Sequence, residues 1–334
     1  MSGAVFIIVV NYRTPDLAIA CLRSIAAQRS ALNGGRVIVI DNLSPDDSVS
    51  KISTAIETGD WSGWAELLPM PRNGGFAYGN NAGIERARAV DPGFAVAVLL
   101  NPDAVVEPGC LHALIGFLDA NPDVGIAGGA IAAPDGTRER CAHRWPSPLG
   151  ELESAAQFAP VSRALQSRAV SPELPDQATR CDWVSGACFA VRREVLDAVG
   201  PLDEGYFLYF EEVDFCRRAR LAGWNCAYVP QARVVHLEGA STGIRSARRR
   251  PAYWYASRRR FFVKAYGLAG LVVGDVLWAI GRATLVVRRA LGLGGRAGQE
   301  REPSRYAFDL LWGDLTALVR GELRRVERMT VHGR

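Results

Sequence analysis

The chain has 334 residues, of which 49% are hydrophobic and 22% charged. This is enough apolar material for a sizeable core and excludes a disordered or low-complexity chain. The net charge of +4 is unevenly distributed, because residues 1–240 carry 20 basic and 28 acidic side chains whereas residues 241–334 carry 19 and 7. We therefore predict an acidic main domain over residues 1–240 and a basic tail over residues 241–334.

Through the first 130 residues, short apolar runs alternate with segments of helical spacing. The first run, residues 5–10, has no basic segment before it, so we expect a buried strand and not a signal peptide. Strands that are apolar throughout and separated by helices predict a mostly parallel sheet with helices on both faces, an α/β fold. The predicted strands cover residues 5–10, 37–40, 67–68, 94–100 and 125–132, and the predicted helices residues 17–27, 48–57, 80–90 and 109–120.

Polar residues follow three of these strands. Asn11, Asp41 and the run Asn101-Pro102-Asp103 each stand at a predicted carboxyl end. Ligands of open α/β sheets bind at that edge. The sequence therefore predicts a binding site there.

The second half of the main domain is less regular. Residues 140–180 are rich in Pro, Ser, Ala and Gln without clear periodicity, and we expect a loop or lid there. Regular structure is expected to resume at residues 183–191, with helices at 193–199 and 211–221 and a strand at 224–229. The seven cysteines form no CxxC pair, which favours buried thiols in a reducing compartment over a zinc knuckle.

Several residues suit a reaction at a diphosphate. Asp103 and His236 are candidate ligands for a divalent cation, and Glu211, Glu212 and Asp214 are candidate bases. Each also has a structural explanation: a turn residue, a core histidine or an acidic first helical turn. The functional hypothesis rests on their occurring together in this order.

In this order the residues resemble glycosyltransferase family 2, of GT-A fold, especially its bacterial rhamnosyltransferase-like branch, over about residues 4–265. The most specific stretch is the run from Asn73 to Ile84, NGGFAYGNNAGI. The resemblance implies Glu212 as catalytic base with Glu211 as the alternative, and Asp103 and His236 as ligands of Mn²⁺ or Mg²⁺. It implies donor contacts from Asn11, Tyr12, Asp41, Asn73, Gly74, Gly75, Phe76, Asn80, Asn101 and Asp103, and acceptor contacts from Trp183, Ser185, Gly186 and Asp214.

Two positions depart from the family pattern. Asn101 replaces the first carboxylate of the metal motif, and Glu212 stands where Asp is more usual. The resemblance still implies an inverting transfer from a dTDP- or UDP-linked sugar, with dTDP-rhamnose suggested by the branch. The acceptor would be a polyprenyl-diphosphate-linked sugar or a glycan in cell-wall or surface-polysaccharide assembly. A sugar nucleotidyltransferase and a non-catalytic membrane scaffold with a degenerate transferase domain stay open as alternatives.

The tail combines arginine clusters with apolar segments. Arg248–Arg250 and Arg258–Arg260 precede the mostly apolar residues 267–287, which contain Asp275 and Arg282. This composition favours an in-plane or hairpin-like segment on an anionic membrane over a full span. It predicts a cytoplasmic enzyme peripheral to the inner face of the plasma membrane. A helix packed on the domain or in a homodimer is the alternative; no nucleic-acid motif is present. Residues 306–328 are expected to form one amphipathic helix.

Overall fold

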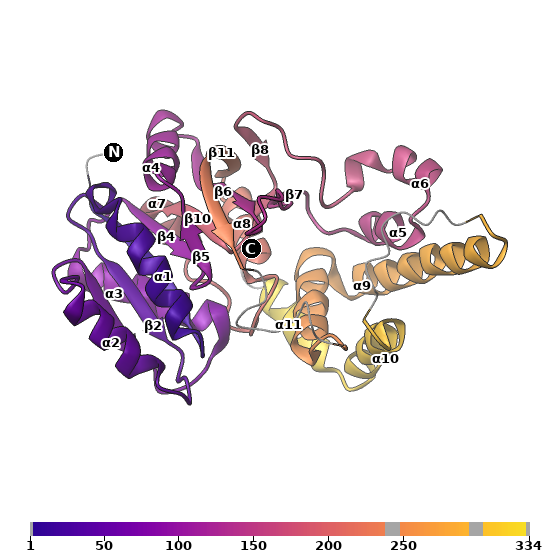
Figure 1. Ribbon diagram of the computed structural model, residues 1–334. Coiled ribbons are helices and arrows are strands. Elements are labelled where there is room, and N and C mark those ends of the chain that lie inside the picture. The colour runs from indigo at the N-terminus through magenta and orange to yellow at the C-terminus, as the bar shows by residue number, and fades with distance from the viewer. Residues whose placement is uncertain (1–2, 238–247, 294–302, 332–334) are drawn as a thin grey trace. The chain divides into compact units, whose positions relative to one another are not determined.

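The computed structural model describes residues 3–237, 248–293 and 303–331. The chain forms two compact units, one of Met1–His143 with Glu173–Arg245 and one of Arg144–Pro172 with Ser246–Arg334. The sequence-based division at residue 240 differs from this one, since residues 144–172 join the C-terminal helices. Figure 1 shows the elements of both units.

The first unit is built on a mixed sheet. Its strand order is β3-β2-β1-β4-β10-β6-β11-β5, with β8 paired to β11. The strands from β3 to β4 are parallel, whereas β10 is antiparallel to both β4 and β6. The strands of this sheet are β1 (Val5–Asn11), β2 (Val37–Asp41), β3 (Ala65–Pro69), β4 (Val96–Leu100), β5 (Ala104–Val106), β6 (Val124–Ala132), β8 (Thr179–Cys181), β10 (Cys188–Arg192) and β11 (Asn225–His236).

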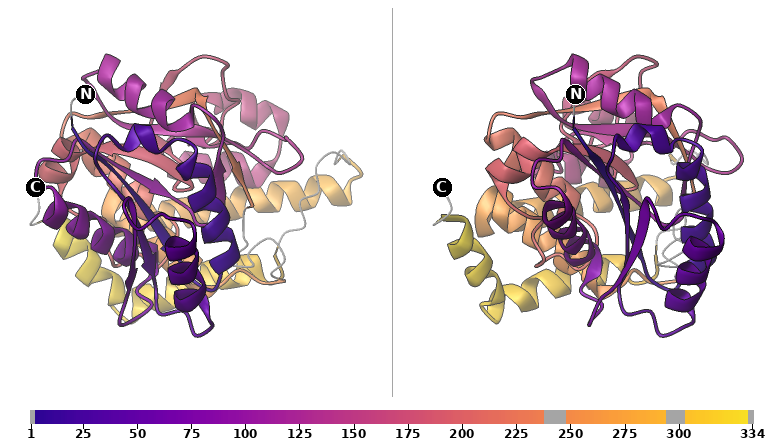
Figure 2. Two further views of the ribbon diagram at one scale, coloured as in Figure 1. Left: turned by 60° about the vertical axis from the view of Figure 1, so that its left-hand side comes forward. Right: turned by 90° about the vertical axis from the view of Figure 1, so that its left-hand side faces the viewer.

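Helices cover both faces of this sheet, as the right-hand view in Figure 2 shows. The helices of the unit are α1 (Pro15–Ala26), α2 (Ser48–Thr58), α3 (Gly75–Val90), α4 (Cys110–Ala120), α7 (Arg193–Val199) and α8 (Glu211–Leu221), with the short 3₁₀ helix η1 (Arg29–Leu32). Side chains of α1, α2 and α4 form one core with alternate residues of β1, β2 and β4. The intervening residues of β1 face α3. The predicted α/β fold class is confirmed.

Two glycines let α3 approach β1 closely. A methyl group on Gly79 would lie 2.6 Å from a side-chain carbon of Val10, and one on Gly83 would lie 2.5 Å from Ile8. Any larger residue would therefore push the helix off the strand. Two glycines of the signature run thus act in packing.

Three sequence-based expectations need correction. Helix α3 begins at Gly75, five residues before the predicted start. The expected loop at 140–180 contains β7 (Ala142–His143), α5 (Pro148–Ala156), α6 (Ala159–Ala164) and a 3₁₀ turn, η2 (Gln166–Arg168), besides β8. The single helix expected at 306–328 is two, because Gly321, at φ +72°, separates α10 (Tyr306–Val319) from α11 (Glu322–Val331).

The second unit is helical. Its longest element, α9 (Ala252–Ala290), is interrupted at Gly267, which has φ 71° and ψ 179°. The two halves contact each other across this break, since a methyl group on Gly274 would lie 3.0 Å from the Phe262 ring. Helix α5 packs against the second half, where backbone atoms of Leu152 and Ala156 leave room only for glycine at position 281. Figure 1 shows α5 beside α9.

Candidate active site

The carboxyl ends of β1 and β2 are joined by a buried polar network. Asn11 donates from Nδ2 to Oδ2 of Asp41 at 2.8 Å. Ser44 donates to the same carboxylate from its hydroxyl at 2.8 Å and from its backbone N–H at 2.9 Å. Thr14 in turn donates to Oδ1 of Asn11. This network fixes Asp41 at the predicted binding edge of the sheet, and Tyr12 directly follows β1 there.

The first turn of α3 lies beside this network. Asn73 accepts the Gly75 N–H at 3.1 Å, and Asn42 donates to the Gly75 carbonyl at 2.9 Å. Gly75 has φ +86°, and a methyl group there would lie 1.9 Å from the carbonyl oxygen of Phe207. That carbonyl accepts the N–H of Phe76 at 2.9 Å. A glycine is therefore required where α3 meets the loop that leads to α8.

Two buried amides at this turn have unused acceptors. Asn80 donates to the Phe76 carbonyl at 3.0 Å. The side-chain oxygens of Asn42 and Asn80 have no hydrogen-bond partner within the described part of the chain. Buried acceptors without partners are costly, so they commonly mark a place where a ligand or water donates.

Asp103 and His236 form a candidate cation site. Nε2 of His236 lies 3.2 Å from Oδ1 of Asp103 and 3.2 Å from Nδ2 of Asn101. Both titratable side chains are buried. Two ligands of one octahedral Mg²⁺ ion, each at about 2.1 Å, stand about 3 Å apart. The separation of the two side chains is therefore compatible with their binding one divalent cation together. Within the described residues, no cluster of three or more His, Cys, Asp and Glu suits a metal.

The turn 185–187, between β9 (Trp183–Val184) and β10, lies between the segment that contains Asp103 and the start of α8. The Ala187 carbonyl accepts the N–H of Asn101 at 2.9 Å. A methyl group on Gly186 would lie 3.7 Å from the Phe76 ring and 3.8 Å from the carboxyl carbon of Glu212. One turn thus brings together the end of β4, the start of α3 and the start of α8.

Glu211 is buried and Glu212 is partly buried at the start of α8. Burial raises the pKa of Glu212 to about 7, against hydrogen bonds from backbone groups of α8 and Gly186. Burial, with the charge of Glu212 second, raises the pKa of Glu211 well above its usual range. In the described residues, Oε2 of each glutamate has no hydrogen-bond partner. A carboxylate with a pKa near neutrality and a free oxygen is suited to accept a proton.

The loop before α8 holds a strained backbone. Tyr209 and Phe210 both have φ near +70°, which side-chain-bearing residues rarely adopt. Asp214 stabilises this region, because its carboxylate accepts from the Tyr206 hydroxyl at 3.3 Å and from Nε of Arg218 at 3.0 Å. Both oxygens of the predicted acceptor residue Asp214 are therefore engaged inside the protein.

The remaining predicted acceptor residues lie at β9 and the turn after it. The Trp183 ring stacks on His143, with centroids 4.1 Å apart. Burial lowers the pKa of His143 to about 4, so this imidazole is neutral at physiological pH. Ser185 donates its N–H to the Cys141 carbonyl at 2.9 Å. Gly186 is the member of this group that adjoins Glu212.

Sequence reasoning overlooked three residues of this region. Asn42, the Phe207 carbonyl and His143 each position a predicted site residue. Asn42 directly follows Asp41, so its place after a strand was a usable signal. The sequence around Phe207 and His143 carries no comparable signal, because their partners are distant in the chain.

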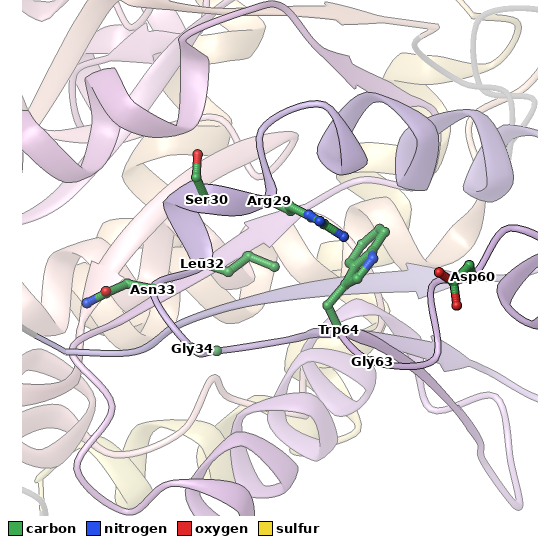
Figure 3. A pocket seen from close by; sticks show the side chains of 9 residues that line it. Arg29, Ser30, Leu32, Asn33, Gly34, Asp60, Gly63 and Trp64 are labelled. Atoms are coloured by element: carbon green, nitrogen blue, oxygen red, sulfur yellow. The ribbon is translucent and has the colours of Figure 1, made fainter.

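A surface hollow of about 550 Å³ lies elsewhere, lined by residues that include Arg29, Asn33, Asp60 and Trp64 (Figure 3). Gly35 and Trp64, which also line it, precede the first residues of β2 and β3. The hollow is therefore at the amino ends of these strands, away from the polar residues described above.

Comparison with known proteins agrees with this arrangement. The family profile "Glycosyltransferase like family 2" matches residues 3–259. The chain belongs to this family. It is thus a family 2 glycosyltransferase, and the resemblance inferred from the sequence is confirmed.

Curated relatives of this glycosyltransferase include rhamnosyltransferases. One is an N-acetylglucosaminyl-diphospho-decaprenol L-rhamnosyltransferase of Mycobacterium tuberculosis, to which this chain is 36% identical over 152 residues. The matched region covers 44% of this chain and 48% of the relative. Another is the rhamnosyltransferase WbbL of Escherichia coli, to which this chain is 33% identical over 88 residues. That match covers 26% of this chain and 27% of the relative. The matches therefore span about half or less of these relatives.

Solved structures show the same fold. The mannosyltransferase PcManGT from Pyrobaculum calidifontis, in complex with GDP-Man and Mn²⁺, has a TM-score of 0.56 and 17% identity, covering 99% of this chain and 85% of that one. GalNAc-T7 with UDP, GalNAc and Mn²⁺ has a TM-score of 0.53 and 14% identity, covering 78% of this chain and 50% of that one. At these identities the likeness shows the fold alone.

Proposed function

We propose that this family 2 glycosyltransferase is an inverting rhamnosyltransferase that uses dTDP-rhamnose and a polyprenyl-diphosphate-linked sugar. The observation that carries the proposal is the turn 185–187, which contacts Glu212 on one side and hydrogen-bonds the Asn101–Asp103 segment on the other. A base and a candidate cation pair therefore adjoin the same short turn. The activity of the mycobacterial relative supports the choice of sugar and acceptor.

The proposed reaction is a single displacement. Glu212 takes the proton of the acceptor hydroxyl as that oxygen bonds to the anomeric carbon. The bond from the anomeric carbon to the diphosphate oxygen breaks, and the electron pair leaves with the nucleoside diphosphate. Asp103 and His236 would hold a divalent cation, Mn²⁺ or Mg²⁺, which compensates charge on the diphosphate when it is bound.

The donor nucleotide is assigned to the edge formed by β1, β2 and the start of α3. Asp41 has an acceptor-only carboxylate fixed by Asn11 and Ser44, which suits the N3–H of thymine or uracil. The unpartnered oxygens of Asn42 and Asn80 suit donors on the nucleotide sugar. Trp183, Ser185 and Gly186 are assigned to the acceptor side.

A transfer assay with purified enzyme tests this function. dTDP-rhamnose, UDP-linked sugars and GDP-mannose would each be offered with a polyprenyl-diphosphate-linked acceptor, in Mn²⁺, Mg²⁺ or EDTA. We expect transfer from dTDP-rhamnose that needs the cation and that Asp103→Ala lowers by about 10²-fold or more. Full activity in EDTA would refute the role of the cation. Release of pyrophosphate from a nucleoside triphosphate and a sugar phosphate would instead identify a nucleotidyltransferase.

A further inference from the structure

The acidic residues of α9 and α10 point into the second unit. Arg258 is 1% exposed, and its guanidinium lies 3.0 Å from Asp275, 3.0 Å from Asp314 and 3.2 Å from Glu151 of α5. Arg259 is 2.7 Å from Asp314. These ion pairs join α5, both halves of α9 and α10 around one buried cation.

The remaining acid of these two helices is also paired. Asp309 accepts from Arg249 through both carboxylate oxygens at 2.6 Å, and its side chain is only 7% exposed. Asp275, Asp309 and Asp314 are the three acids in the sequences of α9 and α10. Ion pairing therefore draws negative charge away from the outer faces of both helices.

Large apolar side chains occupy those outer faces instead. At 3.6 residues per turn, their positions fall on one side of each helix. On the second half of α9 the exposed residues are Val272, Val273, Val276, Ile280, Val286 and Val287, and on α10 they are Phe308, Leu311, Trp312, Leu315 and Val319. A water-facing helix normally has the opposite arrangement, with charges outside and apolar side chains inside.

Arginines stand at the ends of both apolar faces. Arg289 is exposed at the end of α9, and Arg305 and Arg320 are exposed beside the two ends of α10. The whole unit carries 21 basic and 9 acidic residues in residues 144–172 and 246–334. An apolar face bordered by arginines, with its acids turned inward, complements an anionic lipid surface.

We propose that the outer faces of α9, from Leu268 to Ala290, and of α10 dock in the plane of an anionic lipid bilayer. Residues 252–290 have the length and hydropathy of a membrane span, but Gly267 breaks this helix. In the second half of α9, Asp275 forms an ion pair with Arg258 of the first half, and α5 covers another face of this second half. A helix surrounded by lipid would have to bury that charged cluster. The docking surface does not depend on which sugar or acceptor the enzyme uses.

Vesicle flotation with the full-length protein tests this surface. We expect flotation with vesicles of phosphatidylcholine and phosphatidylglycerol, and much less with phosphatidylcholine alone. The variants Val276→Asn/Ile280→Asn and Trp312→Asn/Leu315→Asn should each lower the partition coefficient by about tenfold or more. Leu221→Asn is the matched control, because Leu221 is 71% exposed at the end of α8 in the other unit; it should float like the wild type.

Three outcomes would overturn the proposal. The first is a full-length protein that stays unbound to both kinds of vesicle, and the second is apolar-face variants that float like the wild type. The third is light scattering that shows a dimer converted to monomer by these variants with flotation unchanged, which would assign the faces to a second copy of the chain. Circular dichroism of each variant, together with donor hydrolysis, would show that folding and the nucleotide site are intact.

Discussion

Glu212 carries the acid–base chemistry of the proposed reaction. Its pKa of about 7 follows from burial, and the base must be deprotonated to act. We expect Glu212→Gln to lower transfer by about 10²-fold or more while donor affinity stays nearly unchanged, because an amide cannot take the proton. In the wild type, the rate at saturating donor should rise with pH through about 7 and then level off. Initial rates between pH 5.5 and 8.5 and donor titrations measure both effects.

Glu211→Gln is the matched variant for this experiment. Glu211 is the same residue type in the same turn of α8, so the Glu211→Gln variant controls for the loss of a carboxyl group at the start of this helix. Near-normal turnover in Glu212→Gln with a collapse in Glu211→Gln would assign the base to Glu211. A pH profile without a rise near neutrality would also contradict the role of Glu212.

The sequence predicted which candidate residues stand at the carboxyl edge of the sheet, but it did not predict their contacts. Asp41 and Asp103 could be found because polar residues after apolar strands gather at one edge of a parallel sheet. The contact between His236 and Asp103 depends on β11 pairing with β5 and lies outside local patterns. Asp214 could not be told from a ligand-facing acid, because its partners Tyr206 and Arg218 are recognisable only in the folded loop.

At the scale of elements, the junction of α3 with the loop before α8 depends on Gly75. Its φ of +86° and the 1.9 Å distance that would separate an added methyl carbon from the Phe207 oxygen forbid a side chain. We expect Gly75→Ala to lower the free energy of unfolding by about 2 kcal/mol or more, and to weaken donor binding. Urea denaturation and a donor titration measure the two effects.

Gly116→Ala supplies the control. Gly116 lies in α4 with no atom within 4 Å of an added methyl group. Alanine there should leave donor binding unchanged and stabilise the protein by up to about 1 kcal/mol, because glycine is a poor helix former. Equal stability of the two variants would show that the close approach at Gly75 relaxes without cost.

The local sequence pattern predicted an element correctly where the apolar residues of that element are also the ones that the fold buries. Strands β1, β2 and β4 are buried throughout, so their apolar runs were unambiguous. The start of α3 was missed because Asn73-Gly74-Gly75 is typical of a loop, whereas two of these residues cap or begin a helix. Helix α5 was missed because its packing partner, α9, is about a hundred residues away, and short helices without that partner have weak periodicity.

At the scale of the whole molecule, the second unit is held by the ion cluster around Arg258. Arg258→Met would leave Glu151, Asp275 and Asp314 facing one another without their central cation. We expect this variant to lose about 3 kcal/mol of stability or more at pH 8, because breaking a buried pair leaves uncompensated charge. Hydrogen exchange should show faster opening of α5, α9 and α10, with little change in β1, β2 and β4.

The loss should shrink as pH falls. In the wild type, burial raises the pKa of Asp275 to about 6 and also raises the pKa of Asp314. A carboxyl group whose folded-state pKa is raised contributes stability at low pH that is lost as pH rises through that pKa. The positive charge of Arg258 lowers both pKa values, so its removal should raise them further. The stability of Arg258→Met should therefore lie closer to that of the wild type at pH 5.5 than at pH 8.

Adding Asp275→Asn and Asp314→Asn to Arg258→Met should restore stability at pH 8. Arg249→Met, at an exposed arginine paired with Asp309, is the control and should change stability far less. A pH-independent loss, or no rescue by the two asparagines, would show that Arg258 acts through packing of its side chain and not through charge.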